Sequence, residues 1–362
     1  MSEKATFATF ETSSGAKIQR IPLEAFPGFW AYAYLVQRDE YRVLIDSGSG
    51  TDGSHENLLA GLQQAGSKPS ALTHILLTHA HIDLYGGLTK LRPLTNAMIG
   101  VHELDLQTVA HHEARLALIS RRLDSFLAGT GLAAATREQV LSIYRFTKAL
   151  YRSVPVDFTL RESEGGVDKA VDMRLGPLEF IHLPGHCPGH VAIRLDDVVF
   201  CGDMVVEGVT PHLSPESINP FNGLDHYLES LARLQEWSSG ARLILNGHNE
   251  AITDLPSQIA LTKRNILRRM HKAVEALRIP LTIEEVCQTV YGETSGYNLL
   301  LVIEKAGAYV EYLYEHGMIG ITNPGELEQG SPARYQQLQD ETLLYAELER
   351  KVGSYTGIQA TT

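Results

Sequence analysis

The amino-acid sequence predicts an α/β protein in which sheets and helices form layers. Short apolar runs alternate with segments of helical periodicity, which is the pattern of strands that alternate with helices. Several of the apolar runs end in short polar segments that contain histidine and aspartate. The stretch 103–153 differs, because its apolar residues have helical spacing and it contains no clear strand.

Composition limits the possible functions. The chain has 362 residues, 44% hydrophobic and 20% charged, which is typical of a globular protein with one large domain and a smaller one. Its net charge of −12 disfavours a general electrostatic attraction to nucleic acid or to an anionic membrane. The three cysteines form no CxxC motif, which favours a reducing compartment. No signal core and no apolar run of about 18 residues occurs, so we expect a cytoplasmic protein without a membrane span.

The predicted elements follow in chain order. Before the helical stretch the pattern predicts strands over 17–22, 29–36, 42–46, 73–77 and 98–102, with helices over 55–66 and 86–92. The stretch 103–153 is predicted to be a helical insertion, divided near Gly129–Gly131, that forms a wall or lid of a substrate cleft. After it we expect strands over 178–183, 191–195, 198–201 and 242–245, and a helix over 225–237.

The sequence Thr78–Gly87, THAHIDLYGG, follows the buried strand 73–77 and carries the clearest chemical signal. Alternate side chains of an extended or turning segment face the same side, so His79, His81 and Asp83 can converge on one point. Imidazole and carboxylate groups are ligands for zinc and similar divalent metals. This stretch therefore predicts a metal site just beyond the strand end.

Other strand ends repeat this chemistry. His186 follows strand 178–183, Asp203 follows strand 198–201, and His248 follows strand 242–245. Asp46, at the end of strand 42–46, is either a carboxylate that supports the metal ligands or a turn residue with an Asx cap. For His102, His111 and His112, at the start of the insertion, a role on a surface helix is favoured over metal ligation.

Together these motifs resemble the metallo-β-lactamase superfamily. The resemblance covers about residues 15–255 and rests on LIDSG at 44–48, THAHID at 78–83, LPGHCPGH at 183–190, CGDM at 201–204 and LNGHN at 245–249. It implies an αββα sandwich with a two-metal cleft along the strand ends. It also implies that one metal is held by His79, His81 and His186, that Asp203 bridges both metals, and that Asp83 and His248 hold the second. His190 matches a position of the loop motif that is not a ligand in the family, and we interpret it as structural.

Leu84 departs from the family pattern HxHxDH, whose last histidine ligates the second metal. A leucine offers no donor, so the motifs leave three donors for that metal. Either the second metal binds more weakly, with extra water ligands, or the site works with one metal and leaves Asp83 free as a base.

The C-terminal part, 257–335, is predicted to form three helices and a small β wing, and it resembles the winged-helix extension of one branch of the superfamily that includes an endoribonuclease. Over 259–335 the chain has 8 Lys and Arg against 9 Glu and no Asp, a balance of −1, whereas a nucleic-acid reader is usually basic. The cations Arg264, Arg268, Arg269 and Lys272 either contact an anionic substrate group or, as we favour, form a solvated helix face or a homodimer contact. Residues 340–362 are expected to form a short helix and a loose tail.

The leading functional hypothesis is metal-assisted hydrolysis of a small acyl substrate, a thioester, ester or lactone. A metal lowers the pKa of bound water, which gives a hydroxide that attacks the acyl carbonyl. The position of Asp83 in the family implies that it passes the proton to the leaving group. Zinc is the expected metal, one ion or two, and iron or manganese suits the same donors. The alternatives are an endoribonuclease or phosphodiesterase with the same site, a mononuclear iron dioxygenase, and a metal-free binding protein.

Overall fold

A computed structural model describes residues 6–162 and 178–354, and it contains two sheets that pack face to face. The first sheet has the strand order β1 to β7, formed by Ala8–Glu11, Lys17–Phe26, Phe29–Arg38, Tyr41–Ile45, His74–Leu76, Met98–His102 and Phe158–Leu160. The strands β1 to β4 are antiparallel, and β4 to β7 are parallel. The second sheet has the order β11-β10-β9-β8, formed by β8 Leu178–His182, β9 Val191–Leu195, β10 Val198–Gly202 and β11 Leu243–Asn246.

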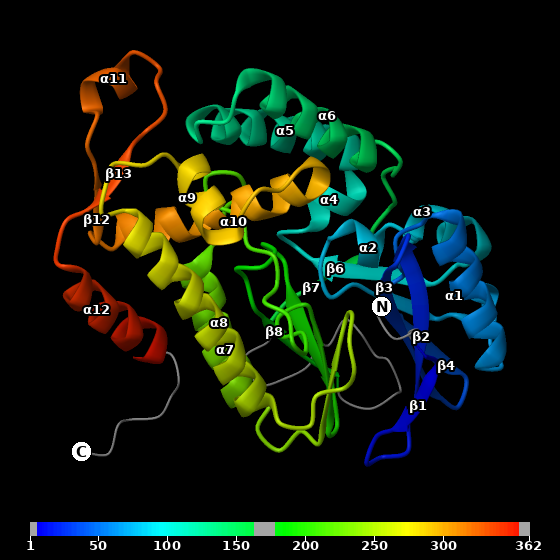
Figure 1. The fold of residues 1–362 in the computed structure, drawn as a ribbon. Helices are drawn as coiled ribbons and strands as arrows, with labels where there is room; N and C mark the ends of the chain where they lie inside the picture. Colours follow the sequence, from blue (N-terminus) through cyan, green and yellow to red (C-terminus); the bar gives the residue numbers. More distant parts are fainter. Residues whose placement is uncertain (1–5, 163–177, 355–362) are drawn as a thin grey trace, which may run out of the picture.

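Apolar side chains fill the space between the sheets and the space outside each of them. Inward-facing residues such as Tyr34, Ile45, Phe200 and Leu245 form the inter-sheet core. The outer face of the first sheet packs against helix α1 (Asp52–Gln64) and the short helices α2 (Ile82–Tyr85) and α3 (Leu88–Leu91). The outer face of the second sheet packs against α7 (Leu224–Trp237) and α8 (Leu255–Ala276). This layering gives the expected αββα sandwich, with helices on both outer faces (Figure 1).

The helical stretch after β6 contains α4 (Leu106–Ala110), α5 (His112–Gly129) and α6 (Ala134–Lys148). In Figure 1 these helices lie above the sandwich, next to α10 (Gly296–Glu315). Gly131 has φ +97° at the turn between α5 and α6, a backbone conformation that favours glycine. The division predicted near Gly129–Gly131 is therefore present.

The C-terminal segment contains α9 (Ile283–Tyr291), α10, α11 (Pro324–Glu328), α12 (Glu341–Ser354) and a two-stranded sheet of β12 (Ile319–Ile321) and β13 (Tyr335–Gln337). The expected N-cap of α9 is present, because Thr282 and Glu285 form a complete capping box. The winged-helix assignment and the boundaries 15–255 and 257–335 stay predictions. The expected loose tail beyond residue 354 lies outside the described residues.

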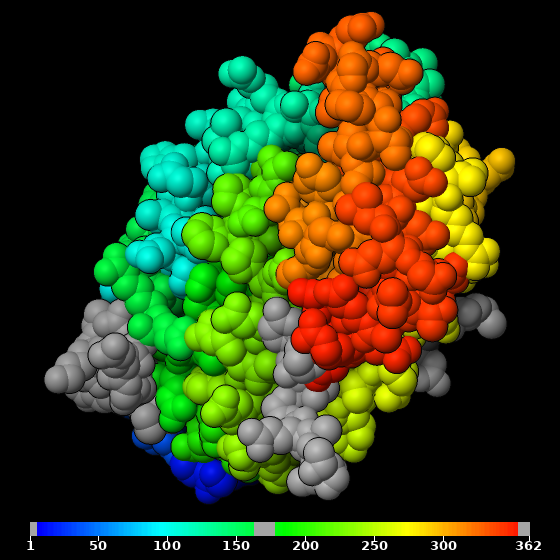
Figure 2. All heavy atoms as spheres, turned by 90° about the vertical axis from the view of Figure 1, so that its left-hand side faces the viewer, coloured from blue at the N-terminus to red at the C-terminus, as the bar shows by residue number. Residues whose placement is uncertain are grey.

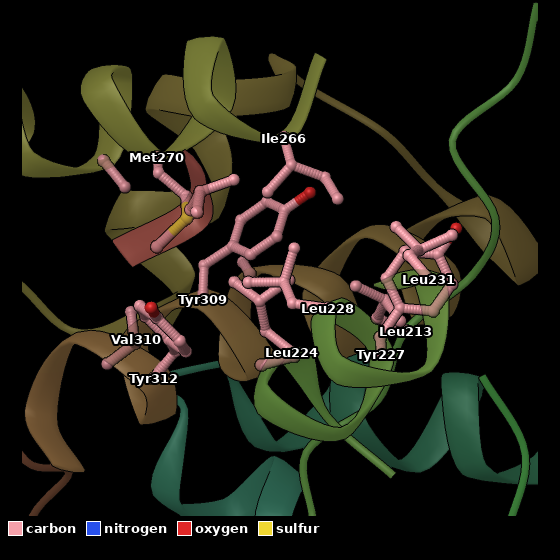
Figure 3. Packing of buried hydrophobic residues seen from close by; sticks show 14 of the residues in the cluster. Leu213, Leu224, Tyr227, Leu228, Leu231, Ile266, Met270, Tyr309, Val310 and Tyr312 are labelled. Atoms are coloured by element: carbon pink, nitrogen blue, oxygen red, sulfur yellow. The ribbon is translucent and has the colours of Figure 1, made fainter. Parts of the chain in front are cut away.

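The helices α7, α8 and α10 share one apolar core. Tyr309 of α10 is fully buried, and Figure 3 shows its ring between Ile266 and Met270 of α8 and Leu228 of α7. In Figure 2 the orange and red atoms of the C-terminal segment lie directly against the green atoms of the sandwich. Because this core is continuous, the C-terminal helices are held firmly enough to form part of a site.

Three sequence expectations differ from the structure. Strand β1 (Ala8–Glu11) was not expected, and β2 extends four residues past Pro22. Pro22 has no backbone N–H to donate to a neighbouring strand. It is tolerated because β1 pairs with β2 only as far as Arg20, so no residue of β1 lies opposite the proline. The segment Asn323-Pro324-Gly325, expected as a turn, begins the short helix α11, with the proline in the first helical turn where its missing N–H is tolerated.

Candidate metal centre

The side chains predicted to bind metal converge at one end of the sandwich. His79, His81 and Asp83 follow β5, His186 follows β8, Asp203 follows β10 and His248 follows β11. Their donor atoms form two groups, and within each group all donor atoms lie within 4.8 Å of one another. The strand ends therefore bring together all six residues that the sequence singles out.

The first group contains His79, His81, His186 and Asp203. His79 Nε2 and His81 Nδ1 are 3.0 Å apart, and Asp203 Oδ2 lies 3.8 Å from His79 Nε2 and 3.7 Å from His186 Nε2. Burial lowers the pKa of His79 and His81 well below the ordinary value and that of His186 to about 4. These imidazoles are therefore neutral near pH 7, the form that binds metals.

The second group contains Asp83, Asp203 and His248, so the two groups share Asp203. His248 Nε2 is 2.9 Å from Asp203 Oδ2 and 3.4 Å from Asp83 Oδ2. Burial opposes the charged form of His248, but the two carboxylates outweigh it and raise its pKa to about 10. A cation thus occupies this position when the metal is absent, and a metal binding there would displace its proton.

Unsatisfied polar atoms show that the first group fits a metal ion. His186 Nε2 and Asp203 Oδ1 are buried and have no hydrogen-bond partner among the described residues. Buried polar atoms without partners are costly. Since these atoms lie in a group of imidazole and carboxylate donors, a bound divalent metal would satisfy them.

Hydrogen bonds hold several side chains of the two donor groups in position. The imidazole Nδ1 of His186 is 2.7 Å from the carbonyl oxygen of His212, and Nδ1 of His248 is 2.8 Å from that of Trp30. His190 Nε2 accepts the backbone N–H of Asp203 at 3.1 Å, in agreement with the structural role expected for it. Such contacts fix the tautomer and the orientation of imidazole ligands.

Asp46 lies behind this arrangement. Its carboxylate accepts the backbone N–H and the hydroxyl of Thr78, both at 2.9 Å, and the Thr78 hydroxyl is 3.2 Å from His79 Nδ1. Burial raises the pKa of Asp46 to about 8. Of the two sequence alternatives, the carboxylate that supports the metal-type donors is the one that the contacts favour.

Asp105, which sequence reasoning missed, joins the two histidine-bearing loops. Its carboxylate accepts the backbone N–H of Ala80 at 2.9 Å and that of Gly189 at 3.0 Å, and the Cys187 thiol lies 3.3 Å from Oδ2. The first N–H belongs to the loop of His79 and His81, the second to the loop of His186. A lone aspartate after strand 98–102 carries no sequence signal for this role.

Comparison with known proteins identifies the family. The sequence pattern of the metallo-beta-lactamase superfamily matches residues 29–248. The chain belongs to this superfamily. The protein named "Probable metallo-hydrolase YqgX" from Bacillus subtilis is 24% identical over 232 residues, which cover 63% of this chain and 89% of that one. An "Atrochrysone carboxyl ACP thioesterase" from Aspergillus novofumigatus is 27% identical over 168 residues, 42% of this chain and 49% of that one.

Solved structures show the same fold. A metallo-beta-lactamase family protein from Thermus thermophilus superimposes with a TM-score of 0.71 at 24% identity, over 88% of this chain and 98% of that one. The protein is thus a metallo-β-lactamase-fold enzyme of the hydrolase type, with a histidine and aspartate cluster suited to bind a metal ion.

Leu84 occupies the position of the missing family histidine. It is fully buried and packs with Ala25 and Ala31. Its carbonyl oxygen accepts the N–H and hydroxyl of Ser47 at 2.6 and 2.9 Å. Within the described residues, the second group thus consists of three donor side chains.

A cleft of about 1380 Å³ is lined by every residue of the two donor groups except the fully buried His79. The side chains that line it come from the sheet edge, from α5 and α6 of the helical stretch, and from α10. Arg269 and the exposed cations Arg264, Arg268 and Lys272 do not line it. The contact between these cations and a substrate, which was the less favoured expectation, therefore has no support from the cleft geometry.

The three histidines at the start of the insertion lie outside both donor groups. The surface-helix role expected for them is wrong for two. His102 is buried on β6 and stacks on His182, with the ring centroids 4.0 Å apart. His112 is buried at the start of α5, with Nδ1 2.9 Å from the Tyr85 hydroxyl, and His111 is exposed. The reason is that the insertion packs its first turns onto the sandwich.

No helix within residues 6–162 and 178–354 is long and apolar enough to cross a membrane.

Proposed function

We propose that this enzyme hydrolyses acyl substrates in a metal-dependent reaction, with thioesters as the first choice and esters and lactones next. The observation that carries the proposal is the pair of donor groups that share Asp203 at the base of the cleft. In such an arrangement both a nucleophilic water and an acyl oxygen can be held next to positive charge.

The thioester preference has two supports. A distant relative is named as a thioesterase, although the match covers about half of that protein. In addition, apolar side chains of α5, among them Leu116, Ile119 and Leu123, line the cleft beside the donor groups. An acyl chain can pack against this apolar surface while its carbonyl group points to the metal centre.

The chain offers residues for each metal. His79, His81 and His186 with Asp203 would hold the first metal, and Asp83 and His248 with Asp203 the second. The bound metal supplies Lewis-acid chemistry and lowers the pKa of a coordinated water. We propose zinc, because three imidazoles and a carboxylate suit it, and iron or manganese accept the same donors.

Asp83 is the residue we propose for proton transfer. Its carboxylate belongs to the second group, 3.4 Å from His248 Nε2, and it lines the cleft. Burial raises its pKa, so a proton is retained there more readily than on an exposed aspartate. From this position it can receive the proton of the attacking water and pass it to the departing thiolate or alkoxide.

Metal analysis combined with a substrate panel tests the proposal. We expect purified protein to contain zinc and to hydrolyse a short-chain thioester faster than a model phosphodiester. One iron per chain with oxygen consumption on a persulfide would support the dioxygenase alternative instead. Faster cleavage of the phosphodiester would support the phosphodiesterase alternative, and a metal-free protein without hydrolytic activity would contradict all three enzyme proposals.

A further inference from the structure

Three basic side chains line the helical side of the cleft. They are Arg115 on α5, Lys148 on α6 and Lys305 on α10, and we call this side the helical wall. All three are partly buried. Cations in such surroundings lose hydration and need a negative partner to offset the loss.

The described residues supply no such partner within bonding distance. No carboxylate of the described residues lies within 4 Å of any of the three cations. Lys305 Nζ donates to the carbonyl oxygen of Thr210 at 3.1 Å, and Arg115 donates to the side-chain oxygen of Asn219. Lys148 Nζ lies 5.6 Å from the centroid of the Tyr144 ring. All these partners are uncharged.

Lys148 also has no lasting role as a counterion of the donor groups. Burial lowers the pKa of Lys148, and the negative charges of Asp83 and Glu304 offset this effect only in part. A bound divalent metal would neutralise Asp83 and Asp203, and Glu304 is already paired with His212 at 2.7 Å. A negative group on a bound ligand would therefore stabilise the charged form of Lys148.

The cleft also has acidic side chains in its lining. Glu207 and Glu250 line it, and Glu250 forms a two-pronged ion pair with the buried Arg20 at 2.9 and 3.0 Å. Glu250 is therefore already neutralised by Arg20, whereas the three cations of the helical wall have no carboxylate within 4 Å among the described residues.

The segment that carries two of the three cations of the helical wall also has a positive net charge. Residues 112–153 contain seven Lys and Arg side chains against three Asp and Glu, a net charge of +4 in a chain of −12. The hydroxyl-bearing side chains of Tyr144 and Tyr297 also line the cleft. They are available as neutral donors beside the cations.

We propose that the helical wall is an anion subsite, in which Lys148, assisted by Arg115 and Lys305, binds a carboxylate or phosphate group carried by the acyl substrate. The proposal rests on the proposed acyl hydrolysis and narrows its substrate class. The substrate would then have an acyl carbonyl at the metal centre and a negative group toward α6 and α10.

A matched set of thioesters tests the subsite. The three substrates share the thiol and the acyl length and end in a carboxylate, a phosphate or a neutral carboxamide. For wild type we expect kcat/KM to be higher for at least one anionic substrate by about tenfold or more, as a charged hydrogen bond allows. In Lys148→Met this preference should fall to less than about threefold through a rise in KM. The carboxamide should react within about twofold of the wild-type rate.

Control variants make the outcome specific. Arg145→Met removes an exposed cation one turn earlier on α6 that does not line the cleft, and it should behave as wild type. Lys148→Arg should retain the preference for the anionic substrate. The proposal is overturned if wild type shows no preference, if Lys148→Met slows all three substrates equally, or if Arg145→Met has the same effect as Lys148→Met.

A binding measurement separates this proposal from the proposed function. If none of the thioesters is hydrolysed, the acyl-hydrolase proposal fails, and metal-loaded wild type and Lys148→Met are titrated with inorganic phosphate by calorimetry. Because the metal contribution is common to both proteins, weaker binding to Lys148→Met supports the subsite. Equal binding by both proteins contradicts it.

Discussion

At the scale of single residues, Asp203 determines how the two donor groups are spaced. Its backbone N–H donates to His190, and its carboxylate faces His79, His186 and His248. The ring of His190 also stacks on that of His79, with the centroids 4.7 Å apart. A histidine outside both donor groups thus orients both a shared carboxylate and a neighbouring imidazole.

The first residue-scale prediction concerns His79→Ala. Removing one imidazole from a group of four donors should cost most of the bound metal, because affinity depends on ligand number and geometry. Metal content by atomic spectroscopy and activity should fall together. His111→Ala, at an exposed histidine outside both groups, is the matched control. Full metal content in His79→Ala would contradict the assignment.

The second concerns Asp105, which holds two backbone N–H groups with its two carboxylate oxygens. In Asp105→Asn the amide group cannot accept at both positions, and an unsatisfied buried N–H costs about 1–3 kcal/mol. We expect a lower free energy of unfolding and metal affinity that is weaker by about tenfold. Asp157→Asn is the control, since Asp157 accepts a backbone N–H from Ile99 outside the centre. An asparagine oxygen can still accept this single N–H, so the variant should keep metal affinity and most of its stability.

The third concerns Leu84, where a donor is absent from the second group. We expect metal titration of the apoprotein to show two unequal steps or one step. Leu84→His should tighten the weaker step, provided that the imidazole reaches the second group. Leu84→Ala removes the same packing without adding a donor, so it should destabilise the protein without tightening the step. Two equal, tight steps in wild type would show that another donor replaces the histidine.

At the scale of elements, the sequence predicts the sandwich strands and the convergence of the six donors because both depend on local patterns. Apolar runs mark the strands, and polar donors at strand ends meet by topology. The anion subsite could not be predicted in this way. Lys148 and Arg145 look alike on an amphipathic helix, and only the packing of α10 against α6 brings Lys148 to the cleft. The position of Asp105 likewise depends on how two distant loops meet.

An element-scale prediction concerns the insertion, whose helix α5 contributes Leu116 to the cleft. In Leu116→Ala the loss of apolar contact should change the ratio of kcat/KM between long and short acyl chains by about tenfold. The control is Leu118→Ala, because Leu118 is 43% exposed and does not line the cleft. If both variants changed only the stability, the insertion would be a scaffold element.

At the scale of the whole molecule, the C-terminal helices are part of the site as well as of the core. Through Glu304 and Lys305, α10 reaches the cleft, and Tyr309 on the same helix anchors it among α7 and α8. Glu304 pairs with His212, whose carbonyl oxygen faces His186 Nδ1. The position of α10 is thereby coupled to His186 of the first donor group. A shift of the C-terminal segment would therefore move a residue of the candidate metal centre.

The whole-molecule prediction concerns nucleic acid, which some winged-helix proteins bind. The exposed cations of α8 are balanced within 259–335, where the net charge is −1, and the chain as a whole carries −12. The +4 of residues 112–153 suits a small anion in the cleft, whereas a long polyanion also meets the acidic remainder of the surface. We therefore expect no sub-micromolar binding of RNA or DNA in a fluorescence titration at about 150 mM salt.

Tight binding with a steep salt dependence would instead favour the endoribonuclease alternative. The double variant Arg264→Glu with Arg268→Glu would then show whether α8 contributes to that binding.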